Sequence, residues 1–163
     1  MSLINHRRRS AIWHGASQKV GQTAAPLFLD RIDIQCEITP VPFKDISKAA
    51  QGEPSAEIRK RVIRAREIQA ERFSGQKGIH CNAQMSERMI HQYAEPDEAG
   101  ISMLRMAMER LSLSARAYNR ILKVARTIAD LEGCEHVESH HLAEAIGYRT
   151  LDRGDWAERG IGR

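Results

Sequence analysis

The sequence is poor in aromatic side chains, in cysteine and in long apolar runs, and the last two shortages each exclude a class of protein. Phe, Trp and Tyr make up 5% of its 163 residues, and its three cysteines are scattered. Such cysteines form no disulfide framework, so we expect a reducing, cytoplasmic compartment. No run approaches the ~20 apolar residues that span a bilayer. Residues 1–15 contain three arginines but no apolar secretory segment. We therefore expect no membrane association.

An excess of charge of one sign is also nearly absent. The formal net charge is +4, and residues 1–36 contain five Lys/Arg against two Asp/Glu. The remaining residues contain twenty against nineteen, so there is no strong global field that would attract phosphate. Arginine outnumbers lysine by nineteen to six. Arginine suits planar contacts to carboxylates and phosphates, although solvated helix faces and surface ion pairs are its more usual use.

The usual catalytic signatures are missing as well. The sequence has no G-x-x-x-x-G-K-[ST], H-E-x-x-H, G-x-S-x-G or C-x-x-C pattern. Thiolate and imidazole ligands suit zinc, and Cys134, His136, His140 and His141 lie close together in the sequence. Their spacing matches no known zinc site, and adjacent histidines point to different sides of a helix. We therefore predict ordinary helix-cap and surface roles for them, and no metal.

One segment shows the period of a strand. Ile32, Ile34, Cys36 and Ile38 alternate with polar residues, which predicts a half-buried strand over residues 29–38 that ends before Pro40. A single strand cannot satisfy its own edges. Its partners must therefore come from elsewhere, which suggests the end of an α/β domain joined to a helical domain.

The rest of the sequence has helical periodicity. Ser55, Ser86 and Asp97 are candidate N-caps, while Gly75, Gly78 and Gly133 are candidate stops. An apolar stripe of Ile58, Val62, Ala65 and Ile68 marks the first long helix, and the clearest pattern begins at Ala115. The spacing predicts helices over residues 56–73, 87–93, 115–131 and 139–146. It also predicts a helix after Asp97 whose apolar face contains Ile101, Leu104, Met108 and Leu111.

Two arginines stand out as candidate anion contacts. Arg31 lies at the start of the predicted strand, just before its alternating apolar residues and flanked by Asp30 and Asp33. Arg116 lies in the first turn of a long helix, where a cation opposes the helix dipole. Binding of an anion such as phosphate at that helix terminus would explain Arg116. A local salt bridge of each arginine with a nearby carboxylate is the alternative.

Longer stretches resemble one family. Residues 29–34 (LDRIDI) resemble the L-L-D-R-[FI]-D-[IL] element of the magnesium-chelatase and MCM branch of AAA+ ATPases. Residues 107–133 (AMERLSLSARAYNRILKVARTIADLEG) are similar to the C-terminal lid of magnesium-chelatase-like proteins of the ComM (YifB) type, and residues 141–149 (HLAEAIGYR) resemble its final helix. Two short segments, SAEIR at 55–59 and NAQMS at 82–86, resemble further parts of the family. The resemblance covers residues 27–153.

The resemblance implies an ATP-driven ring, a homo-hexamer in full-length members, with ATP and Mg²⁺ at its subunit interfaces. The family's sensor-2 arginine, in an S-x-R element, corresponds to Arg116 and would contact nucleotide phosphates. Its arginine finger corresponds to Arg31 and would act in trans on a neighbouring subunit's γ-phosphate. Members of the ComM type are linked to DNA processing, so DNA is an implied partner.

The departures from the family pattern limit what this chain can do alone. Walker A, Walker B and sensor 1 all precede the finger in the family, and this sequence contains none of them. Ala24-Ala25-Pro26-Leu27-Phe28-Leu29 replaces the usual S-G-P-L-L. We therefore expect no tight ATP binding and no enzymatic activity from this chain by itself.

The expected fold class is mainly α, a helical AAA+ lid bundle preceded by one orphan β-strand from a truncated α/β core. We predict a disordered head at 1–26, a core remnant at 27–54, the lid at 55–149 and a flexible tail at 150–163. Two other functions stay open: a free-standing nucleic-acid-binding module that uses the head and the helix after Ser55, and an interaction protein that joins a ring of intact ATPases. The first has six Lys/Arg against three acids on that helix, but no recognisable DNA-reading motif.

Overall fold

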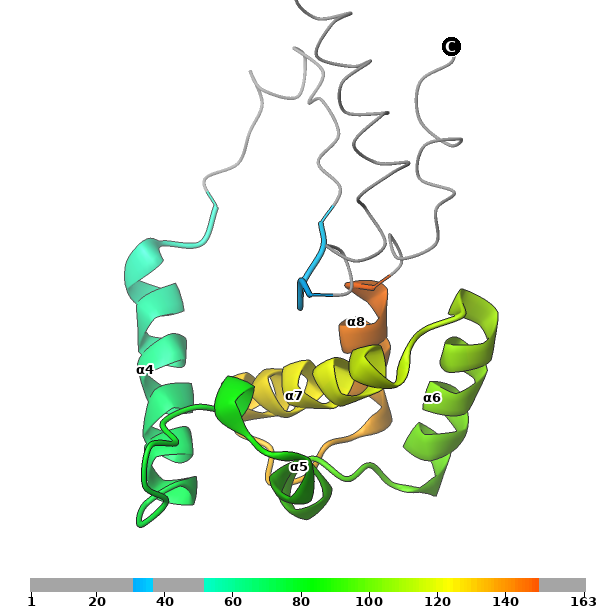
Figure 1. Ribbon diagram of the computed structural model, residues 1–163. Helices are drawn as coiled ribbons and strands as arrows, with labels where there is room; N and C mark the ends of the chain where they lie inside the picture. The colour runs from blue at the N-terminus through cyan, green and yellow to red at the C-terminus, as the bar shows by residue number, and fades with distance from the viewer. Residues whose placement is uncertain (1–30, 37–51, 150–163) are drawn as a thin grey trace, which may run out of the picture.

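The helices that the structure describes assemble around one central helix, α7. The computed structural model describes residues 31–36 and 52–149. Figure 1 shows α4 at one end of α7, α6 at the other, α5 below it and α8 behind it. The predicted helical bundle is confirmed. The predicted domain boundaries stay predictions, and the head at 1–26 and the tail at 150–163 lie outside the described residues. The elements are α4 (Ser55–Arg72), η1 (Asn82–Gln84), α5 (Glu87–Tyr93), α6 (Glu98–Leu111), α7 (Ala115–Glu132) and α8 (Ser139–Gly147).

Local capping chemistry sets most of the helix starts. The side chains of Ser86, Asp97 and Ser114 each accept a hydrogen bond from the amide three residues further on, at 3.4, 2.7 and 3.2 Å. Each such bond satisfies one of the unpaired amides at a helix start. The prediction for α4 was wrong by one residue, because Pro54 is its N-cap and Ser55 is already helical. The fixed φ of proline, −61° here, suits this position without a side-chain cap.

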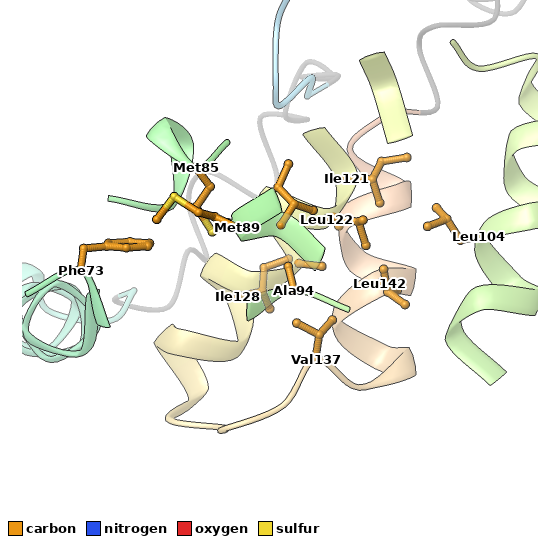
Figure 2. Close-up of a cluster of buried hydrophobic side chains, with 13 residues drawn as sticks. Phe73, Met85, Met89, Ala94, Leu104, Ile121, Leu122, Ile128, Val137 and Leu142 are labelled. Atoms are coloured by element: carbon orange, nitrogen blue, oxygen red, sulfur yellow. The ribbon is translucent and has the colours of Figure 1, made fainter. Parts of the chain in front are cut away.

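The apolar core lies between α7 and the helices packed on it. Figure 2 shows Leu104 of α6 reaching towards Ile121 of α7 and Leu142 of α8, with Phe73 at the far end of the same cluster. Among the described residues, no helix is both long and apolar enough to cross a membrane. The buried members of the cluster are Phe73, Met85, Met89, Ile90, Ala94, Leu104, Ile121, Leu122, Ala125, Ile128, Val137, Leu142 and Ala145.

Only the second half of α4 takes part in the bundle. Ala65 and Gln69 are buried, whereas Ile58 and Val62, on the predicted apolar stripe, are 43% and 44% exposed. The first half of the helix extends past α7, so nothing among the described residues covers its stripe (Figure 1). The apolar period therefore predicted the helix correctly and its burial only in part.

The predicted strand is not seen where the structure describes it. Residues 31–36 contain a turn at Arg31 and a bend at Asp33 and form no strand, while 29–30 and 37–38 lie outside the described residues. Gln35 is buried, but Ile32 and Ile34 are 42% and 51% exposed. The physical reason is that no second strand lies beside them among the described residues. The backbone N–H of Gln35 instead donates to the backbone carbonyl of Tyr148, at 3.1 Å.

The start of α6 packs so closely on α8 that it requires glycine. A Cβ on Gly100 would lie 2.7 Å from Leu142 Cδ1 and 2.8 Å from Pro96 Cβ. A shift of the Pro96 ring is costly, because Pro96 and Val137 form an isolated parallel bridge that holds the loop before α6 to the segment before α8. Gly100→Ala is therefore expected to lower the free energy of unfolding by about 1–3 kcal/mol, the usual cost of overpacking.

Urea unfolding followed by circular dichroism measures this effect. The matched control is Gly147→Ala in the last turn of α8, where a Cβ would meet nothing within 4 Å. Alanine is the better helix former by up to about 1 kcal/mol, so this variant should be unchanged or more stable. Equal effects of the two substitutions would contradict the packing account.

Candidate functional site

The N-terminus of α7 presents Arg116. Ser114 caps the helix, Arg116 is its second residue, and the first turn has no acidic residue. The Arg116 side chain is exposed. The amides at a helix start favour an anion, so the guanidinium of Arg116 and the helix terminus can act on the same phosphate. This placement agrees with the position predicted for Arg116; its contact with nucleotide stays a prediction.

Arg31 is brought to the same helix by Arg120. The Arg120 guanidinium donates from Nη1 to the Arg31 carbonyl, at 2.8 Å, and forms an ion pair with Asp33. Arg116 and Arg120 are four residues apart on one side of α7, which puts their Cβ atoms about 6 Å from each other. The two arginines predicted from the sequence, which are 85 positions apart in it, are thus connected through the first two turns of one helix. Arg31 itself is exposed.

A second polar cluster, which the sequence analysis missed, lies buried beside the apolar core. The Asp130 side chain is completely buried and accepts hydrogen bonds from Arg72 at 2.8 and 2.5 Å. It also accepts from Asn82 Nδ2 at 2.7 Å and from Arg126 Nε at 3.1 Å. Arg126 donates further to the carbonyls of Cys134 and Glu135, at 2.5 and 2.7 Å. This Asp130 cluster connects α4, η1, α7 and the turn after α7, so its role is to hold these elements together.

The charge of Asp130 is maintained by its partners. Burial acts to raise the pKa of the Asp130 carboxyl, but the hydrogen bonds from Arg72 and Asn82 and the charge of Arg126 outweigh burial and lower this pKa below its usual value. The carboxylate is therefore ionised at neutral pH. The pair Arg126 and Asp130, at i and i+4 within an otherwise apolar pattern, was the one sequence signal that pointed to it.

The histidines near the end of α7 form a cap. Glu132, His140 and His141 place one potential ligand atom each within 4.8 Å of one another, whereas Cys134 and His136 do not belong to this group. However, Nδ1 of His141 accepts the backbone N–H of Glu138 at 2.9 Å, so in the neutral ring Nε2 carries the proton and points to Glu132, at 3.1 Å. A metal on Nε2 would require a proton on Nδ1, facing that N–H.

The pKa shifts in this cap favour an ion pair between His140 and Glu132. The hydrogen bond to Glu132 raises the pKa of His140, and the hydrogen bonds from His140 and His141 lower the pKa of Glu132. Glu132 was absent from the predicted group, and His141, which is fully buried, serves the start of α8. The geometry therefore gives His141 the predicted cap role and His140 a surface role beside Glu132, while the absence of a metal stays a prediction.

Comparison with known proteins fits this bundle. Residues 52–149 match the family described as “Magnesium chelatase, subunit ChlI C-terminal”, a match that takes in all the helices from α4 to α8. The chain belongs to this magnesium-chelatase-like family and contains its C-terminal domain.

Its relatives refine that assignment to the ComM and YifB type. The chain is 41% identical to “Competence protein ComM” of Haemophilus influenzae and 42% identical to YifB of Salmonella typhimurium, over 127 residues in both cases. It is 39% identical to YifB of Escherichia coli over the same length. Each match covers 77% of this chain and 24% of the relative. The chain therefore spans about a quarter of the length of these relatives.

Proposed function

We propose that this chain is the C-terminal lid of an ATP-dependent AAA+ ring protein, and that it supplies Arg31 and Arg116 to a nucleotide site built mainly by other residues. The observation that carries the proposal is the bond from Arg120 to the Arg31 carbonyl, which brings the candidate finger to the helix that presents the candidate sensor. The backbone of Arg31 and the side chain of Arg116 are thus both attached to the first two turns of one helix, and guanidinium groups of this kind suit the phosphates of ATP.

The two arginines would have different tasks. Arg116, at the positive end of α7, would contact the phosphates of bound ATP and report the nucleotide state to the lid. Arg31 would reach the γ-phosphate of a nucleotide held by a neighbouring subunit and stabilise the charge that develops during transfer to water. The residues that hold ATP and Mg²⁺ would lie in the three quarters of the relatives' length that this chain does not match.

A chimaera tests the proposal. Residues 27–153 of this chain would replace the matched C-terminal region of ComM from Haemophilus influenzae, and ATP hydrolysis would be compared among intact ComM, ComM cut before that region, and the chimaera. We expect the cut protein to lose hydrolysis and the chimaera to regain it. A chimaera that assembles normally but hydrolyses no more ATP than the cut protein would refute the lid function.

The nucleic-acid alternative rests on α4. Its exposed cations include Arg59, Arg64 and Arg66, but Lys60 is paired with Glu57 at 2.7 Å and Arg61 is paired with Glu53. These ion pairs reduce the charge left for phosphate. If the chain alone bound duplex DNA with an affinity that fell steeply with salt, this result would favour nucleic-acid binding over the lid function. The ATPase-partner alternative has a different test, in which the chain is added to an intact ring and ATP hydrolysis is measured.

A further inference from the structure

We propose that Arg120 and Arg149 are positioning residues that fasten segment 31–36 to the lid, so that Arg31 moves together with α7 and α8. This inference rests on the proposed function, because it concerns how the candidate finger is held. It assigns a task to two arginines that the family resemblance does not single out. Figure 1 shows the segment lying beside α7 and the C-terminal end of α8.

Hydrogen bonds to the backbone of the segment hold it at three places, residues 31, 32 and 35. Arg120 donates to the carbonyl of Arg31, Arg149 donates to the carbonyl of Ile32, and the amide of Gln35 donates to the carbonyl of Tyr148. Arg120 also pairs with the Asp33 carboxylate. All of these bonds join residues 87 or more positions apart, so no local turn explains them.

Arg149 is the unusual member of this group. It follows α8 and is 1% exposed, although arginine is rarely buried to this extent unless its guanidinium is bonded. Its guanidinium donates to a backbone carbonyl, so this contact recognises the path of the segment and not its side chains. Such a contact fixes where the chain of Ile32 runs, and thereby where the neighbouring Arg31 projects.

Apolar packing contributes little to this attachment. Ile32 and Ile34 are among the exposed large apolar side chains of the protein, and Gln35 is the only buried side chain between residues 31 and 36. The segment is therefore held mainly by arginine donors. Loss of one donor should release the segment while the apolar core among α5, α6, α7 and α8 stays intact.

Hydrogen exchange on the full chain tests the attachment without ATP. A hydrogen bond from a charged donor changes such an equilibrium by a factor of about 10 to 100, so Arg120→Ala should speed exchange of the Gln35 amide by about that factor. Arg149→Met fills the buried position with an unbranched apolar side chain and should likewise speed exchange of the Gln35 backbone amide. Arg105→Ala, an exposed arginine of α6, is the control and should leave the Gln35 amide unchanged. Unchanged exchange in Arg120→Ala and Arg149→Met would overturn the proposal.

ATP hydrolysis by the chimaera tests whether the attachment positions Arg31. We expect Arg120→Ala to lower the rate about 10- to 100-fold, and to have no further effect once Arg31 is already alanine, since coupled residues are not additive. Equal losses in the presence and absence of the Arg31 guanidinium would show a merely structural role and overturn the positioning task. If Arg31→Ala has no effect at all, the proposed function fails, while faster exchange would still show the attachment.

Discussion

Arg31→Ala is expected to lower ATP hydrolysis by the chimaera by about a factor of 10³ or more, because arginine fingers contribute about 10³ to 10⁵ in related ATPases. A finger acts late in the reaction, when negative charge has spread over the transferred phosphoryl group. Its removal should therefore reduce kcat far more than it weakens ATP binding. Steady-state hydrolysis together with binding of a non-hydrolysable ATP analogue separates these two effects.

Two further variants make the result specific. Arg31→Lys keeps the charge but loses the planar fork, so it should recover only part of the rate. Arg59→Ala removes an exposed arginine from the free half of α4 and should leave hydrolysis unchanged. If Arg31→Ala weakens ATP binding and leaves kcat alone, Arg31 is a ground-state contact and not a finger.

Asp130→Asn is expected to cost about 3–5 kcal/mol of unfolding free energy, because removal of one charge from a buried ionic group leaves the others uncompensated. Arg126 would keep its charge with its side chain 2% exposed, and Arg72 with 12% exposed. Domains of this size have only about 5–15 kcal/mol of stability. Urea unfolding should thus show a large shift of the midpoint, or no folded baseline.

An exposed pair provides the matched comparison. Glu57→Gln breaks the bond to Lys60 on the surface of α4, where both side chains are more than half exposed, and should cost at most about 1 kcal/mol. Because the Asp130 cluster joins α4 to α7, Asp130→Asn should also release the protected amides of α4. Similar costs for the two substitutions would mean that the Asp130 cluster does not hold α4 in place.

The stability of the folded protein should fall in acid partly through the Asp130 cluster. The folded protein lowers the pKa of Asp130, so this carboxylate adds stability at pH values above about 3.9, the usual carboxyl pKa in an unfolded chain. That contribution disappears as the pH falls from there through the lowered pKa. A stability profile from pH 7 to pH 2 should therefore fall less in a folded Asp130→Asn protein than in the parent; parallel profiles would contradict this.

Local chemistry made the helices predictable. The caps at Ser86, Asp97 and Ser114 need only a hydroxyl or a carboxylate three residues before an amide, and Gly133 ends α7 with φ of 78°. These signals occupy a few adjacent positions, so they could be read without any tertiary contact. The resemblance, likewise, depended on continuous stretches.

The missed features depend on residues far apart in the sequence. In the sequence, Asp130 is an ordinary polar residue of a helix. Its buried contact with Arg72, 58 positions away, exists only in the fold. Burial of Gln35 instead of the neighbouring isoleucines depends on the carbonyl of Tyr148. Period-two alternation predicts a strand only where a partner strand exists, and none lies beside residues 31–36 among the described residues.

The bond between Arg149 and Ile32 also sets an order of events during synthesis. The two residues are 117 positions apart, and ribosomes add about 5–20 residues per second, so Ile32 is made about 6 to 23 seconds before its partner exists. The helices, whose caps and cores are closer in sequence, have time to form first. Throughout that interval, the backbone carbonyl of Ile32 has no Arg149 side chain to accept from, so residues 31–36 join the lid only after its last helix has been made.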